Sequence, residues 1–279
     1  MLTGRNQVIR RLESERDLEQ CVDLQSLVWG LSDEETVSAP VLAVCSRHQA
    51  LILGSFEGDL LTGFCFSLPS LFRGVPSHHS HMLAVRPEYR DQGIGRTLKT
   101  AQFEALKAEV GWITWTFDPL ESRNARLNLK LGVSIGTYIR DLYGDGASCL
   151  LHRDIGTDRF LAEWPTSLSR EKQPVTVPAA GTPGTAILAS AWDPRGYYRP
   201  LAVYSDLGGA SLLLEIPADI QRIKQSDPAC ARAWREMTRK AAEHYFSRGY
   251  RIHRFHTYMQ KHPESRRSFY ILEALQPDA

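Results

Sequence analysis

The chain has no long hydrophobic segment. None of its apolar runs approaches the ~20 residues that span a bilayer. The residues before position 8 contain no apolar stretch of the kind that a secretory signal carries. We therefore expect a soluble, cytoplasmic protein without a membrane partner.

Cysteine is scarce and scattered. The five cysteines include no C-x-x-C pair, and their odd number fits neither a disulfide framework nor a zinc site. We expect them to be small core residues in a reducing compartment, and we predict no metal. They are Cys21, Cys45, Cys65, Cys149 and Cys230.

An excess of charge of either sign is also absent. Thirty-three Lys and Arg residues stand against 32 Asp and Glu residues. The chain therefore lacks the basic surplus that nucleic acids and anionic surfaces attract, and we expect no nucleic-acid partner. Any anion that binds must be held by a local site.

What remains is a mixed succession of strands and helices. Periodicity predicts helices near residues 14–30, 39–47, 95–110, 122–131 and 228–249. Strands are predicted at 8–12, 50–56, 60–68, 78–85, 112–117, 135–142, 185–192, 201–205, 212–216, 250–258 and 268–275. The predicted fold class is α/β, with a mixed, mostly antiparallel sheet flanked by helices and a second, smaller α/β region at the C-terminus.

A stretch rich in Pro and Gly divides the chain. Residues 170–184 contain three prolines and almost no large apolar residue, a composition typical of a linker. We predict one domain at 1–168, a linker at 169–184 and a C-terminal α/β region at 185–279. The element order of that last region echoes residues 50–117, which suggests a degenerate internal repeat.

A glycine loop joins the predicted strand at 78–85 to the helix that follows it. Its sequence is Arg90-Asp91-Gln92-Gly93-Ile94-Gly95. After such a turn, backbone N–H groups gather at the positive end of the helix dipole, and glycine lets phosphate oxygens approach them. The loop therefore indicates a pyrophosphate site, although a G-x-G sequence alone is also found in ordinary tight turns.

The stretch 81–96 resembles the central motif of the GCN5-related N-acetyltransferase (GNAT) superfamily, Q/R-x-x-G-x-G/A. Arg90, Gly93 and Gly95 fill the motif. The resemblance covers residues 8 to about 145 and is to a bacterial subfamily with a C-terminal extension. It implies a GNAT-like fold and an acyltransferase domain that binds acyl-coenzyme A.

The resemblance implies acetyl-coenzyme A, or another acyl-coenzyme A, as co-substrate. In the superfamily the loop amides hold the pyrophosphate, and the backbone of the preceding strand binds pantetheine. The coenzyme A-binding residues implied here are Leu83, Val85, Arg90, Gln92, Gly93, Ile94, Gly95, Arg96, Asn124 and Asn128.

Histidines are the candidates for a general base, because an imidazole titrates near the pH at which amine deprotonation needs one. His79 stands fourteen positions before Gly93, the offset at which histone-type members carry a general-base glutamate. His79 is therefore our leading candidate. His81 would share its face unless the strand carries a bulge. The alternative for His79 is a histidine that is hydrogen-bonded at a strand edge.

The expected general acid departs from the family pattern. Many members carry a tyrosine four residues before the glycine that ends the last helix, and Asn128 occupies that position. An amide cannot protonate a thiolate. Tyr138 and Tyr143 are the nearest substitutes, and we select Tyr143 as a catalytic candidate. Both could equally be half-buried strand aromatics, in which case the thiolate leaves without dedicated help.

Two further patterns have open interpretations. Asp118, followed by proline, could contact an amine or orient a histidine, although such a residue is more often a turn former. Arg232, Arg235 and Arg239 lie at helical spacing. We interpret them as a solvated helix face rather than an anion site.

The sequence thus predicts an N-acyltransferase that moves an acetyl or short acyl group from acyl-coenzyme A to an amine of a small molecule or protein, in a direct ternary complex. It would act as a monomer or homodimer. One alternative is O-acylation or decarboxylation on the same fold. Another is a non-catalytic module that binds acyl-coenzyme A. The sequence identifies neither the acceptor nor the acyl chain length.

Overall fold

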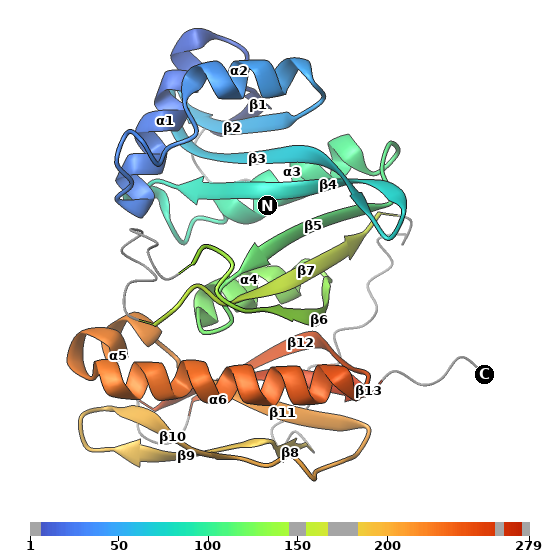
Figure 1. Cartoon of the computed structure of the whole chain (residues 1–279). Helices are drawn as coiled ribbons and strands as arrows, with labels where there is room; N and C mark the ends of the chain where they lie inside the picture. The colour runs from blue at the N-terminus through green and yellow to red at the C-terminus, as the bar shows by residue number, and fades with distance from the viewer. Residues whose placement is uncertain (1–6, 145–154, 167–183, 260–264, 275–279) are drawn as a thin grey trace. The chain divides into compact units, whose positions relative to one another are not determined.

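The structure of the chain is a computed structural model that describes residues 7–144, 155–166, 184–259 and 265–274. Within these ranges the chain forms two compact units, drawn in Figure 1. The first unit comprises 7–115 and 164–166, and the second comprises 116–144, 155–163, 184–259 and 265–274. The boundary falls inside two strands, β5 (Trp112–Phe117) and β7 (Arg159–Pro165).

The first unit is built on a sheet with the strand order β1-β2-β3-β4-β5. Its pairs are antiparallel except for β4 and β5, which are parallel. The strands are β1 (Gln7–Arg11), β2 (Leu51–Glu57), β3 (Leu60–Phe72) and β4 (Val75–Val85), followed by β5. The helices are α1 (Glu15–Trp29), α2 (Ala39–Arg47), the 3-10 turn η1 (Pro87–Tyr89) and α3 (Ile94–Leu106).

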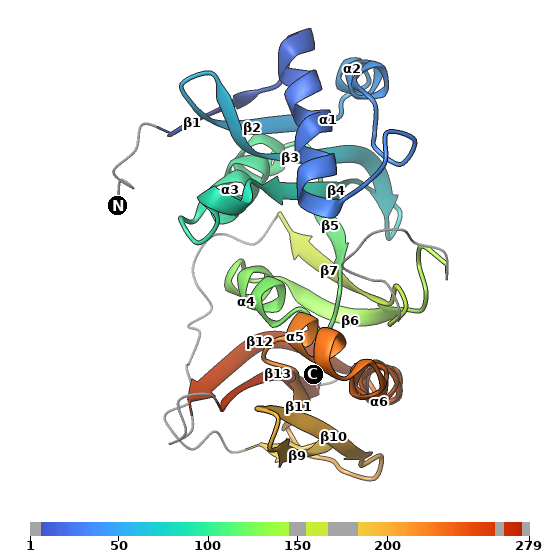
Figure 2. The same ribbon diagram turned by 90° about the vertical axis from the view of Figure 1, so that its left-hand side faces the viewer.

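Helices cover both faces of this sheet (Figure 2). Phe64 and Phe66 belong to a hydrophobic core that is shared with α1 and α2. Cys65, which lies between them, points the other way, because its Sγ lies 3.8 Å from the carbonyl oxygen of Leu98 in α3. Since successive side chains of a strand point to opposite faces, α1 and α2 pack on one face and α3 packs on the other.

The second unit has the strand order β7-β6-β12-β13-β11-β8 and a separate ribbon of β9 and β10. Its strands besides β7 are β6 (Ser134–Ile139), β8 (Thr185–Ala186), β9 (Leu188–Asp193), β10 (Tyr197–Val203), β11 (Ser211–Ile216), β12 (Tyr250–Met259) and β13 (Arg266–Ala274). The helices are α4 (Ser122–Lys130), α5 (Ile220–Ser226) and α6 (Pro228–Ser247). Asp227 caps α6 by accepting a hydrogen bond from the Cys230 backbone N–H at 3.1 Å, and a proline follows it in the first turn.

The predicted mixed α/β fold with a mostly antiparallel sheet is confirmed. The β3–β4 hairpin is longer than predicted, and β7 and α5 were not predicted. The interval predicted to be one strand at 185–192 is divided between β8 and β9. The proposed linker lies outside the described residues apart from Gly184, and the domain limits at 168 and 185 remain a prediction.

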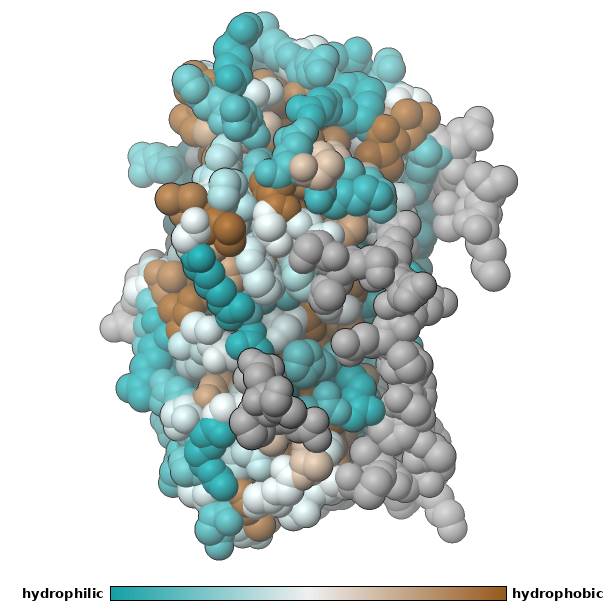
Figure 3. Space-filling model, turned by 90° about the vertical axis from the view of Figure 1, so that its right-hand side faces the viewer, coloured by the Kyte–Doolittle hydropathy of each residue, from teal (hydrophilic) through white to brown (hydrophobic). Residues whose placement is uncertain are grey.

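The four cysteines in the described ranges are free thiols, and Cys149 lies outside those ranges. None of the described helices combines the length and apolarity that crossing a bilayer requires. On the face drawn in Figure 3, hydrophobic residues form separate small patches among hydrophilic ones.

A buried ion pair links α6 to the turn after β5 within the second unit. Arg235 Nη2 donates to Asp118 Oδ2 at 2.7 Å, and Asp118 Oδ1 accepts from the Leu120 backbone N–H at 2.8 Å. The side chains of Arg235 and Asp118 are 4% and 2% exposed. Asp118 is therefore a turn former whose charge is neutralised by an arginine.

The prediction that the α6 arginines form a solvated face is wrong for two of the three. Arg235 is buried, and Arg239 Nη2 lies 2.6 Å from Asp158 Oδ1. Arg232 is exposed, as predicted. Because an arginine reaches a distant carboxylate through a long side chain, helical spacing did not reveal these partners.

Arg235→Met should lower the free energy of unfolding by about 3–5 kcal/mol, because it removes the arginine that pairs with the buried Asp118 carboxylate. Urea unfolding followed by circular dichroism measures the loss. The exposed Arg232→Met on the same helix is the control and should change stability by under about 0.5 kcal/mol. Equal effects of the two substitutions would contradict a structural role for the pair.

Candidate functional site

The glycine loop has the backbone geometry that an anion site needs. Gly93 is the N-cap of α3 and has the left-handed conformation φ 84°, ψ 0°. Apart from Gly93 and its two chain neighbours, no described residue has an atom within 4 Å of the position that a Cβ on Gly93 would take. The first N–H groups of a helix have no intrahelical partner. The start of α3 therefore presents unpaired amides beside open space.

The side chains of the loop suit the same role. Ile94 is buried and anchors the helix, since its Cγ2 would lie 3.2 Å from a Cβ placed on Gly63. Arg90 and Arg96 are exposed and form no ion pair with any described residue. Their guanidinium groups are therefore available to an anion that binds at the amides. This part of the chain fits a pyrophosphate group.

Strand β4 separates from β5 immediately after the first histidines. The parallel register joins Ser77 to Trp112, His78 to Ile113 and His79 to Thr114, and it ends there. Beyond His79, the described part of β4 pairs with β3 alone as far as Val85. Leu83 and Val85 therefore lie on a stretch with one unpaired edge, as a strand that binds pantetheine through its backbone requires.

His79 lies where the two strands part. Its Nδ1 is 3.2 Å from Thr114 Oγ1. Burial, together with the charges of His81 and Lys99, lowers the pKa of His79 to about 4. The imidazole is therefore neutral at pH 7, and it titrates below the near-neutral range expected for a general-base histidine. When Nδ1 donates its hydrogen to the threonine oxygen, Nε2 carries the lone pair that a general base needs.

His81 lies at a β-bulge. The β3 register runs from Phe66–Met82 directly to Ser67–Ser80, so His81 is the extra residue of β4. Its ring lies edge-on to Phe66, with the ring centroids 5.9 Å apart. His79 is paired with Leu68, which packs against the same core as Phe66. Because the bulge comes after Ser80, the alternation of side chains from His79 to His81 is not disturbed. The two histidine side chains therefore lie on the same face of the sheet.

A buried lysine on α3 escaped prediction. Lys99 Nζ donates to Ser80 Oγ at 2.7 Å and to Gln102 Oε1 at 3.3 Å. It also lies 3.8 Å from the centroid of the Trp115 ring. Burial lowers the pKa of Lys99 to about 7. The only sequence signal was a lysine one residue from the apolar stripe of α3.

The remaining predicted site residues lie in the second unit. Asn128 is buried, and its Nδ2 donates to Asn124 Oδ1 at 3.3 Å. Tyr143 is 51% exposed, with the Arg159 guanidinium 5.0 Å from its ring centroid. Tyr138 differs, because burial and a hydrogen bond to the Asp158 carboxylate raise its pKa. Among the tyrosines, Tyr143 is thus the more accessible candidate, and its role stays a prediction.

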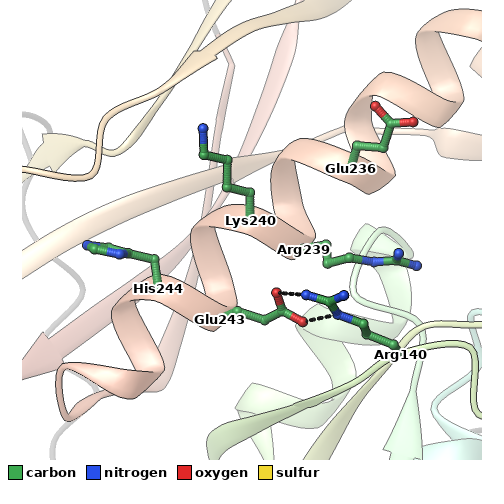
Figure 4. A pocket seen from close by; sticks show the side chains of 6 residues that line it. All are labelled: Arg140, Glu236, Arg239, Lys240, Glu243 and His244. Atoms are coloured by element: carbon green, nitrogen blue, oxygen red, sulfur yellow. Dashed lines mark hydrogen bonds and ion pairs between the residues drawn. The ribbon is translucent and has the colours of Figure 1, made fainter.

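A hollow of about 480 Å³ lies along α6 (Figure 4). Its lining is charged, and Arg140 and Glu243 on it form an ion pair. Arg140 Nη2 donates to Glu243 Oε2 at 2.6 Å, and His244 Nε2 lies 2.7 Å from the Ser205 carbonyl oxygen. We assign it no role. No group of three or more His, Cys, Asp or Glu side chains able to hold a metal occurs among the described residues.

Lys99→Met should stabilise the protein most at neutral pH. Because the pKa of Lys99 is about 7 in the folded chain and about 10.4 in the unfolded chain, the unfolded state binds more protons between these values. The free energy of unfolding of the wild type should therefore rise by about 1.4 kcal/mol for each pH unit from pH 7 towards pH 10.

The difference in unfolding free energy between Lys99→Met and wild type should accordingly shrink over that pH range, as measured by urea unfolding at several pH values. Lys107→Met is the control, because Lys107 is 48% exposed at the end of the same helix. Its difference from wild type should not depend on pH in this way. A Lys99→Met difference that stays constant from pH 7 to 10 would contradict a buried, neutral amine.

No protein-family model and no curated protein matches the sequence. Solved structures with a similar fold exist. An acetyltransferase of the GNAT family from Streptococcus pneumoniae is 15% identical and covers 57% of this chain and 99% of its own, with a TM-score of 0.47. An N-acetyltransferase from Staphylococcus aureus is 15% identical over 58% of this chain and 99% of its own, with a TM-score of 0.46.

The PaiA N-acetyltransferase from Thermoplasma acidophilum, solved in complex with coenzyme A, is 20% identical over 57% of this chain and 99% of its own, with a TM-score of 0.43. The similarity leaves a further region of this chain unmatched. Each of these matches covers somewhat more than half of this chain.

Proposed function

We propose that the chain transfers an acetyl or other short acyl group from acyl-coenzyme A to an amine. One observation carries the proposal. In the first unit, β4 separates from β5 at His79, and the loop after β4 ends at a left-handed glycine, Gly93, at the start of α3. A candidate anion site and a candidate base thus occur on consecutive elements. Acyl transfer from coenzyme A can use both.

Coenzyme A would be held mainly by backbone groups. The amides from Gln92 to Arg96 face the pyrophosphate, and the unpaired edge of β4 at Leu83 and Val85 accompanies the pantetheine. Arg90 adds a cationic donor at the rim. Asn124 and Asn128 are proposed as further contacts to the pantetheine or the sulfur.

The reaction would need one base and one acid. The substrate ammonium loses a proton to His79 Nε2, and the resulting amine attacks the thioester carbonyl. A C–N bond forms, the C–S bond breaks, and coenzyme A leaves as the thiolate. The nitrogen releases its second proton to solvent as the amide forms. Tyr143 is the candidate that protonates the thiolate. Much of the acceleration would come from holding amine and thioester in contact.

The direct test is thiol release. The whole chain is mixed with acetyl-coenzyme A and a panel of primary amines, and free thiol is measured against an enzyme-free blank. Thiol release that depends on an amine, with the acetylated amine detected by mass spectrometry, would support the proposal. Tight binding of acetyl-coenzyme A without release would instead indicate a non-catalytic binding module.

Gly93→Val should weaken coenzyme A binding tenfold or more, ~1.4 kcal/mol or above, because a branched side chain would enter the space that phosphate oxygens need. The matched control is Gly58→Val. Gly58 also has positive φ and open space where a Cβ would stand, but it lies in the β2–β3 turn. Both variants place a valine at a positive φ. Calorimetry showing equal affinities for the two would remove the loop from the site.

His79→Ala should lower kcat by roughly 10²-fold or more while the Kd of coenzyme A hardly changes, since proton transfer acts on the transition state. The deficit should shrink at high pH, where solvent deprotonates the amine. His81→Ala serves as the control, because it removes the neighbouring imidazole on the same face. A His79→Ala variant with wild-type turnover at neutral pH would sink the assignment.

A further inference from the structure

A cavity of about 340 Å³ lies within the second unit, and none of the residues proposed for acyl transfer lines it. Its walls come from the β9/β10 ribbon, from α5, and from the ends of β11, β12 and β13. Pockets for small molecules run from ~300 to ~1,000 Å³. This volume stands at the lower end of that range, so a ligand would be small.

One wall of the cavity is aromatic and partly open to water. Trp192 and Tyr198 meet edge to face, with their ring centroids 5.2 Å apart and their planes at 69°. Trp192 is 42% exposed and Met259, on the same lining, is 59% exposed. A flat ring laid on these side chains would remove their apolar surface from water.

Two arginines on the lining are not paired with a carboxylate among the described residues. Arg222 Nη2 donates to the Arg195 carbonyl oxygen at 3.5 Å, and Arg266 Nη2 donates to the Ala218 carbonyl oxygen at 2.9 Å. Neither arginine forms an ion pair with a residue in the described ranges. Each guanidinium has five N–H donors, so most of them remain available to a ligand.

The carboxylates on the lining are already engaged. Glu215 is 1% exposed, and Arg267 Nε donates to its Oε1 at 2.7 Å. Asp219 caps α5 by accepting from the Arg222 backbone N–H at 3.0 Å. Arg267 offsets the charge of Glu215. The positive charges of Arg222 and Arg266, with the negative charge of Asp219, then leave the cavity with a net charge near +1. That charge suits a monoanion.

The turn between β9 and β10 fixes one of these arginines. Gly196 has φ +92°, and a Cβ placed there would lie 2.8 Å from Arg222 Nη2. The guanidinium of Arg222 therefore packs directly over the glycine, on the side of the cavity that the turn forms. This packing favours a defined direction for its donors.

We infer that this cavity binds a small aromatic carboxylic acid. The ring lies against Trp192 and Tyr198, and the carboxylate accepts hydrogen bonds from Arg222 and Arg266. Arginine presents its donors in a fork that matches a carboxylate. The site belongs to the C-terminal half of the chain and stands independently of the proposed acyl transfer.

The probes are indole-3-propionate, its uncharged amide, and propionate, each titrated into the full chain by calorimetry. None of them carries an amine that could serve as an acyl acceptor. The acid should bind saturably at millimolar concentrations or below. The amide should bind at least tenfold more weakly because it lacks the charge, and propionate should not saturate because it lacks the ring.

The contacts are then removed singly. Arg222→Gln and Arg266→Gln should each raise the Kd of the acid tenfold or more, and Trp192→Ala should weaken the acid and the amide alike. Arg232→Gln is the matched control, because it removes an exposed arginine of α6 that does not line the cavity. Its Kd should stay within twofold of wild type. Unchanged melting temperatures would show that the variants remain folded.

Three results would overturn the inference. They are equal affinities for the acid and the amide, an unchanged Kd in both arginine variants, and the absence of saturable binding by the wild type. Loss of binding in Arg232→Gln would equally count against a site at this cavity. A chain that fails to release thiol from acetyl-coenzyme A would leave the inference standing, because the two tests use different residues and ligands.

Discussion

The left-handed backbone of Gly93 is the constraint on which the proposed chemistry depends. It turns the chain from β4 into α3 within one loop and leaves the first amides of the helix beside open space. A residue with a Cβ would be strained in this conformation and would fill that space. Because β4 ends at the same loop and parts from β5 at His79, one segment contains both the proposed anion site and the candidate base.

The two units stabilise a buried basic side chain in different ways. In the first, Lys99 is buried without a carboxylate and is held by Ser80 and Gln102, so its pKa falls to about 7. In the second, Arg235 is buried against Asp118 and keeps its charge. A lysine can release its proton at modest cost, whereas an arginine cannot and needs an anion. The buried lysine makes the free energy of unfolding depend on pH from about 7 upwards. The buried ion pair makes it depend on both Arg235 and Asp118.

Local features of the site could be predicted from the sequence, and distant contacts could not. The strand, the glycine loop and the helix could be predicted because alternating apolar residues, glycine and an apolar stripe are patterns that residues close together in the sequence form. The bulge at His81 was not, because it depends on the register with β3. The partners of Arg235 and Lys99 lie on other elements, and helical spacing carries no information about them. Strand β7 was missed for a similar reason, since its apolar residues are interrupted by Arg159 and Glu163, which are buried in the fold.

The measurement that tests the central claim most directly is an amide NMR titration of the full chain with coenzyme A. If the start of α3 holds the pyrophosphate, the backbone amide signals of Gly93, Ile94 and Gly95 should move most and should saturate together. Amide signals of the β2–β3 turn at Gly58 should stay in place. Saturable shifts confined to other residues, with Gly93 and Gly95 unmoved, would contradict the account.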